Sequence, residues 1–289
     1  MKTALDATTT SAACGFRVLV FLVATQQRAA AEHLPNEMLP IRNEGFSIQI
    51  ARLRAGPVLT IDDSRLRATM AHRPLTLTEK LLESVRELTA FTAQDQRQVS
   101  RLIARSDLVA IAYGGSTITQ DVARGLERLS AVLGIDTLMF PLESGAEPGF
   151  EPFRASFRST LRPECALESV QWMHILAAIL HSSHSDGLIC LDWNDVVGFF
   201  DKTPQATWCV SQGAKVESAA RLALERLQTR WSQGRAKTLM LILLGEEVSM
   251  RTIKHSLSAA RKIAPDADQL LIAAPTLPWN SPQVITLTS

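Results

Sequence analysis

The chain has 289 residues, of which 46% are hydrophobic and 20% are charged. This composition predicts a globular protein of one large domain or two ordinary ones, and it excludes collagen-like repeats, coiled coils and extensive disorder. Thirty basic side chains against 29 acidic ones leave a net charge of +1, which argues against nucleic acid and acidic membrane surfaces as partners.

The cysteines and the first apolar run indicate the compartment. Four widely separated cysteines form no CxxC pair, so we expect neither a disulfide framework nor a zinc ribbon, and a reducing cytoplasm fits best. The run Val18–Ala24 is too short to span a bilayer, so no membrane insertion is expected. Its length and its valines and leucines favour a buried strand instead.

The first half of the chain alternates strand-like and helix-like stretches. Residues 1–15 are predicted to be a disordered tail. The strand Val18–Ala24 is followed by a short helix-like stretch at Gln27–His33, and Phe46–Leu53 alternates as a half-buried strand does. Thr76–Leu102 has the apolar periodicity of one or two helices. Strands alternating with helices predict a parallel sheet covered on both faces.

A clear strand, turn and helix follow in the middle of this half. Asp107–Ala112 is an apolar strand, Tyr113–Thr117 a glycine-bearing turn and Thr119–Leu133 an amphipathic helix that Gly134 ends. Asp136–Leu142 then supplies another strand.

A long apolar helix separates the two halves. Pro163–His181 has almost no polar face, which predicts a helix buried between two layers. The remaining pattern predicts a four-stranded sheet, with two helices on one face and the long helix on the other. Its strands are Thr207–Ser211, Lys237–Leu244, Gln269–Pro275 and Gln283–Thr288, and its helices are Lys215–Trp231 and Ser249–Ile263.

The connection after the long helix carries a recognisable motif. Gly187–Val196 reads GLICLDWNDV and resembles the loop that follows the central helix of the tubulin/FtsZ family, roughly GLINxDxxDV in its bacterial form. Gly213–Leu227, Thr238–Glu246 and Ser249–Asp268 are similar to the family's next elements in order and spacing.

The resemblance implies an α/β fold in which a Rossmann-like, mostly parallel sheet domain is joined by a long central helix to a four-stranded α+β domain. After the tail, a degenerate GTPase-like domain would cover residues 16–162. The central helix and its connection would cover 163–186, and the two-layer C-terminal domain 187–289.

The family also implies where catalysis would take place. Two neighbouring subunits form one active site there: one binds GTP and the next inserts its acidic loop. By this resemblance Asp192 and Asp195 are the catalytic carboxylates, able to orient a water near the terminal phosphate. Cys190 stands where asparagine is usual, which removes an amide. The residues alone favour Asp195 as the cap of a helix beginning near Val196, with Asp192 as a loop carboxylate, and only the resemblance makes the catalytic interpretation equal to it.

The nucleotide side departs further from the family. The resemblance implies a GTP site, with Mg²⁺ only if GTP binds, at Gly114, Gly115, Ser116 and Thr117. A phosphate cradle needs glycines because backbone amides must approach the anion closely. The family's loop is typically GGGTGTG, whereas Ile118 and Gln120 stand here where glycine is expected.

Two further departures concern the same pocket. Val23–Arg28 lacks the glycine run expected after the first strand, and Asp121, expected in the first helical turn, would repel a phosphate. The residues therefore predict GTP binding that is weakened or lost.

Two other features of the connection have local interpretations. His181, His184 and Asp186 have spacing that would suit a metal on a helix end, but a polar helix terminus is the commoner explanation and no metal is predicted. Trp193, between the two aspartates, is expected to be exposed to a partner subunit.

The sequence thus predicts an FtsZ/tubulin-like cytoskeletal or cell-division-related protein, more a pseudo-GTPase than an enzyme. It would contact FtsZ, or copies of itself, through the acidic loop. Two alternatives stay open: an active, polymerising FtsZ-type GTPase, and a non-enzymatic interaction scaffold outside cell division.

Overall fold

A computed structural model describes residues 15–25, 42–43, 46–55, 60–61, 99–142, 158–164, 172–232, 237–246, 248–276 and 281–289. The predicted tail, apart from residue 15, and the helix-like stretch at Gln27–His33 lie outside these ranges. Of the helix predicted over Thr76–Leu102 only residues 99–102 are described, and they are helical.

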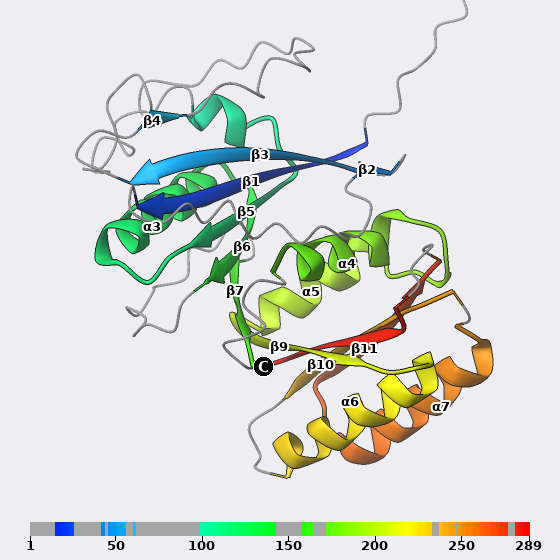
Figure 1. Ribbon diagram of the computed structural model, residues 1–289. Coiled ribbons are helices and arrows are strands. Elements are labelled where there is room, and N and C mark those ends of the chain that lie inside the picture. Colours follow the sequence, from blue (N-terminus) through cyan, green and yellow to red (C-terminus); the bar gives the residue numbers. More distant parts are fainter. Residues whose placement is uncertain are drawn as a thin grey trace, which may run out of the picture.

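The strands form one extended sheet in the order β2-β3-β1-β5-β6-β7-β9-β12-β10-β11-β8, with β4 paired to β3 (Figure 1). In the first half they are β1 (Phe16–Thr25), β2 (Arg42–Asn43), β3 (Phe46–Ala55), β4 (Thr60–Ile61), β5 (Leu108–Tyr113), β6 (Asp136–Pro141) and β7 (Arg158–Pro163). In the second half they are β8 (Gly187–Ile189), β9 (Gln205–Gln212), β10 (Thr238–Leu244), β11 (Gln269–Pro275) and β12 (Gln283–Thr288).

The helices cover both faces of this sheet. They are α3 (Thr117–Val132), α4 (Trp172–His184), α5 (Trp193–Lys202), α6 (Val216–Trp231) and α7 (Met250–Ile263). None of the helices in the described part of the chain combines the length and the apolarity needed to cross a bilayer.

The N-terminal part is the predicted parallel sheet. β3, β1, β5, β6 and β7 pair in parallel, in that order. Because successive side chains of a strand point to opposite faces, the continuous apolar run of β1 fills two cores. Val18, Val20 and Leu22 belong to the core shared with α4, whereas Leu19 and Phe21 belong to the core shared with α3.

The long helix was predicted to begin too early. Residues 158–163 form the unpredicted strand β7, and α4 begins at Trp172 rather than at Pro163. β7 pairs in parallel with β6 on one side and with β9 on the other, so it joins the sheets of the two halves. Buried Ser159, Thr160 and Leu161 explain why this mostly polar segment is a strand: it lies between two others.

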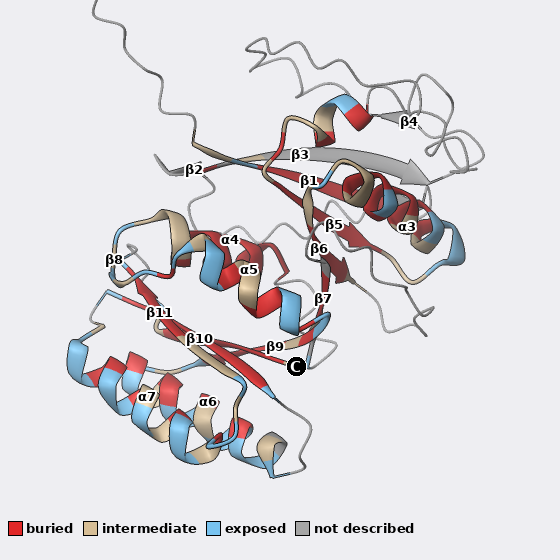
Figure 2. Ribbon diagram, turned by 180° about the vertical axis from the view of Figure 1, so that it is seen from behind, coloured by how far each residue is buried: buried red, intermediate tan, exposed pale blue. Residues whose placement is uncertain are grey.

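The C-terminal part confirms the predicted layers. Met240 and Ile242 of β10 pack with α4 and α5, whereas Leu239 and Leu241 of the same strand pack with α6 and α7. Residues 172–182 of α4 are all buried, as expected of a helix between two layers. Figure 2 shows this contrast, because α6 and α7 expose one side of each helix.

Candidate functional site

The glycine loop lies between β5 and α3 and is closed by side chains. Ser116 is the N-cap of α3, with φ −72° and ψ 146°, and its Oγ accepts a hydrogen bond from the Thr119 amide at 3.3 Å. Thr119 Oγ1 donates to the Gly114 carbonyl at 2.7 Å, and Gln120 Nε2 donates to the Gly115 carbonyl at 3.0 Å. The side chains of Ser116, Thr119 and Gln120 therefore hold the loop in a compact turn of its own.

The backbone of this loop does not use the conformational freedom of glycine. Among the described residues, only Gly134 and Gly245 have a positive φ. A Cβ on Gly114 would meet nothing closer than Thr119 Oγ1 at 3.7 Å, which is an ordinary contact. A cradle for phosphates alternates backbone conformations so that successive amides converge on the anion. The described loop does not fit a triphosphate in this way.

The start of α3 corrects one part of the sequence argument. The helix begins at Thr117, two residues earlier than predicted, so Asp121 lies in the second turn. Its carboxylate pairs with Arg124 at 3.0 Å. Ile118 occupies the first turn instead and is 54% exposed. The first turn of the helix therefore carries an exposed apolar side chain and not the acidic one that was expected there.

The position expected for the first phosphate loop is partly strand. β1 continues through Thr25, and residues 23–25 pair with residues 53–55 of β3. Val23 is fully buried in the core next to α3. Residues 26–28 of the predicted loop lie outside the described residues.

The acidic loop lies between α4 and α5 at the other end of the molecule. Asp192 is the N-cap of α5, and its Oδ1 accepts a hydrogen bond from the Asn194 amide at 3.0 Å. Asp195 lies exposed in the first turn, where a negative charge favours the helix dipole. The capping interpretation thus applies to Asp192 rather than to Asp195, because the helix begins at Trp193 and not near Val196.

Gly187 fixes this loop to the C-terminal sheet, which the sequence argument missed. β8 pairs with the end of β11, and a Cβ on Gly187 would lie 2.6 Å from the Ala274 carbonyl oxygen and 2.8 Å from Pro275 Cα. Such a close approach of two backbones requires glycine. The signal in the sequence is a glycine directly before the short apolar run Leu188–Ile189.

Trp193 is half-buried instead of being exposed to a partner as predicted. Its ring centroid lies 4.6 Å from that of Phe16 and 5.3 Å from that of His184. His184 stacks on Phe16 at 4.2 Å. These contacts tie the acidic loop to the first residue of β1, which is distant in sequence, so the sequence held no local signal for them.

The two histidines at the end of α4 both contact aromatic rings. His181 Nδ1 lies 2.5 Å from Ser185 Oγ, and its ring meets the Phe46 ring edge-on. Burial lowers the pKa of His184, and the nearby Asp107 carboxylate partly opposes that shift. Within the described ranges, no three His, Cys, Asp or Glu side chains are grouped to hold a metal ion.

Cys190 is exposed in the loop, and its Sγ donates to the Ser185 carbonyl at 3.2 Å. Burial and, secondarily, the Asp186 carboxylate raise the pKa of its thiol. The side chain at the position of the family's asparagine is therefore a neutral thiol turned towards its own loop.

The glycine loop and the acidic loop lie at opposite ends of the parallel strands. The glycine loop follows the carboxyl end of β5, whereas the acidic loop contacts Phe16 at the amino end of the parallel strand β1 (Figure 1). The helix α4 runs between these two ends, and its 13 residues span about 20 Å. The structure therefore does not bring Asp192 and Asp195 to residues 114–117 within one chain. Only a head-to-tail contact between chains would do so.

Comparison with known proteins shows the fold. No protein-family model matches the chain, and curated proteins give no significant sequence match. The structure is similar to that of the FtsZ W319Y mutant of M. jannaschii, with a TM-score of 0.54 and 12% identity over 95% of this chain and 91% of the other. It is also similar to an empty FtsZ dimer of the same organism, with a TM-score of 0.52 and 12% identity over 93% and 87%.

These similarities extend over nearly the whole chain and include both the N-terminal and the C-terminal parts. The chain therefore has the tubulin/FtsZ-like fold that the motif around Asp192 predicted.

Proposed function

We propose that this chain is an FtsZ/tubulin-like cytoskeletal protein of the cytoplasm that docks on filament subunits through its acidic loop, while its own GTP binding is weakened or lost. The subunits would be FtsZ or copies of the chain itself. The observation that carries this proposal is the contrast between the two loops at opposite ends of the molecule.

The acidic loop is suited to docking because it is both exposed and fixed. The carboxylates of Asp192 and Asp195 are exposed, and Leu188 beside them is 47% exposed. Strand pairing at Gly187 and the tilted ring contact of Trp193 with Phe16 hold the two sides of the loop. A loop that is ordered before it binds loses little conformational entropy on docking. One of the similar FtsZ structures is itself a dimer.

The carboxylates would have unequal roles in such a contact. Asp192 already caps α5 by accepting a hydrogen bond from the Asn194 amide, whereas Asp195 lies in the first turn and is not the cap. On the nucleotide-bearing end of an FtsZ subunit, Asp195 would therefore be the better placed to act on the partner's bound water. Cys190 supplies no amide to assist it.

Docking would be one-sided. The end of this chain that would receive the next subunit has a glycine loop whose carbonyls are bonded by Thr119 and Gln120, with the exposed Ile118 in the helical turn that follows. A subunit that inserts its loop but offers no nucleotide would cap a filament instead of extending it. Cell division is the process in which such a cap would act on FtsZ.

Sedimentation of FtsZ polymer with GTP tests this proposal. Substoichiometric amounts of the chain should lower the polymer mass and alter phosphate release, and the Asp192→Ala/Asp195→Ala variant should lose the effect. Asp201→Ala is the matched control, because it removes an exposed carboxylate at the far end of α5. If neither polymer mass nor phosphate release responds to the unmodified chain, a scaffold role outside division replaces this proposal.

An active GTPase is the second candidate, because Gly114, Gly115 and Thr117 remain at the amino end of α3, where backbone amides attract anions. Isothermal titration with GTP and Mg²⁺ separates the two. A dissociation constant below about 10 μM, or about 7 kcal/mol, would favour a working pocket.

A further inference from the structure

The strand β7 lies where the two halves of the molecule meet. It pairs with β6 of the first half over residues 158–160 and with β9 of the second half over residues 160–163. Thr160 takes part in both pairings, opposite Met139 on one side and Gln205 on the other. The sheet therefore passes from one half to the other through a strand that is bonded on both sides (Figure 1).

Buried hydrogen bonds reinforce this junction. Ser159 Oγ donates to the Thr203 carbonyl at 2.6 Å, and the Thr160 amide donates to the Pro204 carbonyl at 2.9 Å. Thr203 Oγ1 lies 2.7 Å from Thr238 Oγ1, which ties the same turn to β10. Ser159, Thr203 and Thr238 are almost completely buried, so these bonds break only if the junction opens to water.

The two halves also share one hydrophobic core. Its members from the first half include Val20 and Leu138, and those from the second half include Met240 and Ile285. Leu161 of β7 belongs to the same core, which the buried side chains of α4 fill. Domains that move independently have cores of their own and few contacts across their boundary. Here the core continues across the boundary.

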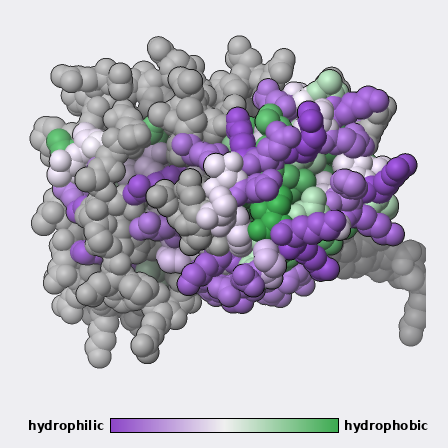
Figure 3. Space-filling view, turned by 90° about the horizontal axis from the view of Figure 1, so that it is seen from below, coloured by the Kyte–Doolittle hydropathy of each residue, from purple (hydrophilic) through white to green (hydrophobic). Residues whose placement is uncertain are grey.

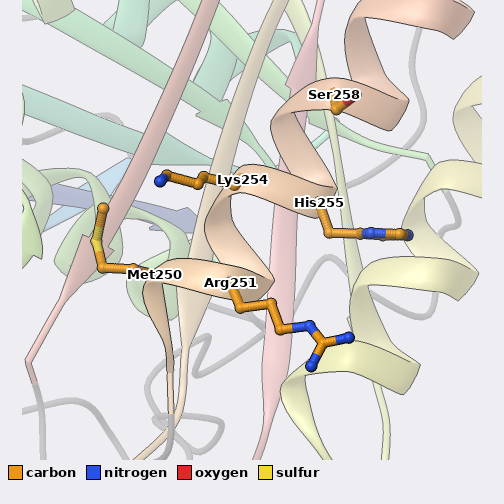
Figure 4. A pocket seen from close by; sticks show the side chains of 5 residues that line it. All are labelled: Met250, Arg251, Lys254, His255 and Ser258. Atoms are coloured by element: carbon orange, nitrogen blue, oxygen red, sulfur yellow. The ribbon is translucent and has the colours of Figure 1, made fainter.

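The outer layers, by contrast, belong to one half each. The core under α3 contains residues of the first half, and the core under α6 and α7 contains residues of β8 and later elements. The outer face of α6 and α7 is mainly hydrophilic around a short apolar strip (Figure 3). On α7, Arg251 and His255 project towards α6, and Lys254 projects the other way (Figure 4). The C-terminal part is thus joined to the N-terminal part through β7 and α4, on the side opposite this outer face.

We infer that β7 is a conformational lock, which makes the two halves of the molecule open and unfold as one unit. Hinge motion needs a few loop or element-terminal residues that absorb the change in φ and ψ, whereas β7 is an interior strand bonded along both edges. The lock keeps the acidic loop and the glycine loop at a fixed separation, because neither half can turn without breaking one of the two pairings of β7. This inference goes beyond the proposed docking, which does not depend on how the halves move.

Native-state hydrogen exchange of the full chain tests the lock. Amides of β5 report on the first half and amides of β10 on the second, because both strands are buried throughout. The slowest amides of the two strands should have protection factors within about threefold of each other, and urea should speed their exchange in parallel. The Thr160 amide, resolved by fragmentation in the mass spectrometer, should be protected to the same extent.

Two matched substitutions test whether a change in one half reaches the other. Leu126→Ala leaves a cavity in the outer core of the first half, and Leu227→Ala does the same in the second. Each should speed exchange in both β5 and β10 by the same factor, about tenfold or more. Lys254→Ala is the control on the outer face of α7, where the side chain is exposed, and it should change neither rate by more than about twofold.

A third substitution acts on the lock itself. Ser159→Ala removes the buried donor to the Thr203 carbonyl. Exchange in β5, in β10 and at the Thr160 amide should then become faster together, by about fivefold.

The inference is overturned if Leu126→Ala or Leu227→Ala speeds exchange in its own half only, because the halves would then unfold separately. It is also overturned if the Thr160 amide exchanges more than about tenfold faster than β5 and β10, which is the result expected of a hinge at the junction. If the two leucine variants do not fold, the comparison of β5, β10 and Thr160 in the unmodified chain still decides.

Discussion

The two ends of the molecule keep their loops in place by different means. At the carboxyl end of the parallel strands, the side chains of Thr119 and Gln120 donate to the loop carbonyls, and Ser116 Oγ accepts from the Thr119 amide, one of the N–H groups that an anion at this helix end would use. At the amino end, Gly187 fixes the acidic loop by backbone pairing and Trp193 by a tilted ring contact with Phe16, and the carboxylates stay exposed. One loop is thus held by its own side chains, whereas the other is held by contacts with the sheet and with β1 that leave its carboxylates exposed.

Gly187→Val should destabilise the acidic loop, and its effect should be the largest of those predicted here. The added Cβ would lie within 2.8 Å of the backbone at Ala274 and Pro275, so β8 must separate from β11. Overpacking of this kind costs about 3 kcal/mol, measurable as a fall in the free energy of unfolding in urea. Limited proteolysis should cleave the loop of the variant sooner.

Gly198→Ala is the matched control for this prediction. Gly198 lies within α5, and a Cβ there would meet only Gln269 Nε2 at 3.9 Å. Alanine should therefore stabilise the helix by about 0.5–1 kcal/mol. A Gly187→Val variant as stable as the unmodified chain would show that the strand pairing does not hold the loop.

Thr119→Val should loosen the glycine loop at the other end of the strands. The substitution keeps the shape of the side chain but removes the hydroxyl that donates to the Gly114 carbonyl. Because Thr119 is buried, we expect a loss of about 1–2 kcal/mol in the free energy of unfolding. Thr229→Val, on the exposed side of α6 with a longer bond of 3.3 Å to the Glu225 carbonyl, should change stability by less than about 0.5 kcal/mol.

The sequence predicted best those elements whose apolar runs are continuous or whose ends carry caps. β10 is a buried run of seven residues, and α7 begins directly after Ser249, whose Oγ accepts from the Thr252 amide at 3.1 Å. The strand β7 was missed because its segment, RSTLRP, is mostly polar. Its strand conformation depends on β6 and β9 beside it, which is information that no local window contains.

The candidate site was predictable in its position but not in its details. The motif placed Asp192 and Asp195 just after the long helix, and the structure has them between α4 and the first turn of α5. Which aspartate caps α5 was predicted wrongly, because Asp192 and Asp195 both stand near the helix start and a shift of three residues exchanges their roles. The contact of Trp193 with Phe16 joins residues far apart in the chain and has no local signature.

Asp192→Ala should distinguish stability from function at the acidic end. Loss of the N-cap bond to the Asn194 amide should cost about 1 kcal/mol, whereas Asp195→Ala should cost only about 0.3–0.5 kcal/mol through the helix dipole. Filament docking should respond in the opposite order, with Asp195→Ala the more damaging. Asp192→Asn, which can still cap the helix, should restore the stability; if it does not, the cap is not the source of the loss.

The smallest effect concerns pH at the same end. Burial lowers the pKa of His184 below 6.5, its ordinary value in an unfolded chain, so the folded protein favours the neutral ring. Above pH 6.5 both states are neutral and the histidine contributes nothing to the pH dependence. As the pH falls below 6.5 the unfolded chain takes up the proton first, so stability declines with falling pH.

His174, whose pKa burial also lowers, adds to the decline in the same direction. Replacing His184 with phenylalanine retains a ring against Phe16 and Trp193 but removes the titrating group. The unfolding temperature of this variant, measured at pH 7 and pH 5, should fall less than that of the unmodified chain. His174 contributes to the remainder, as does Glu217, whose carboxyl pKa is lowered by the hydrogen bond from Thr252. Equal falls for the two proteins would mean that the ring of His184 takes up its proton as readily in the folded loop as in water, and the aromatic contacts would then not shield it.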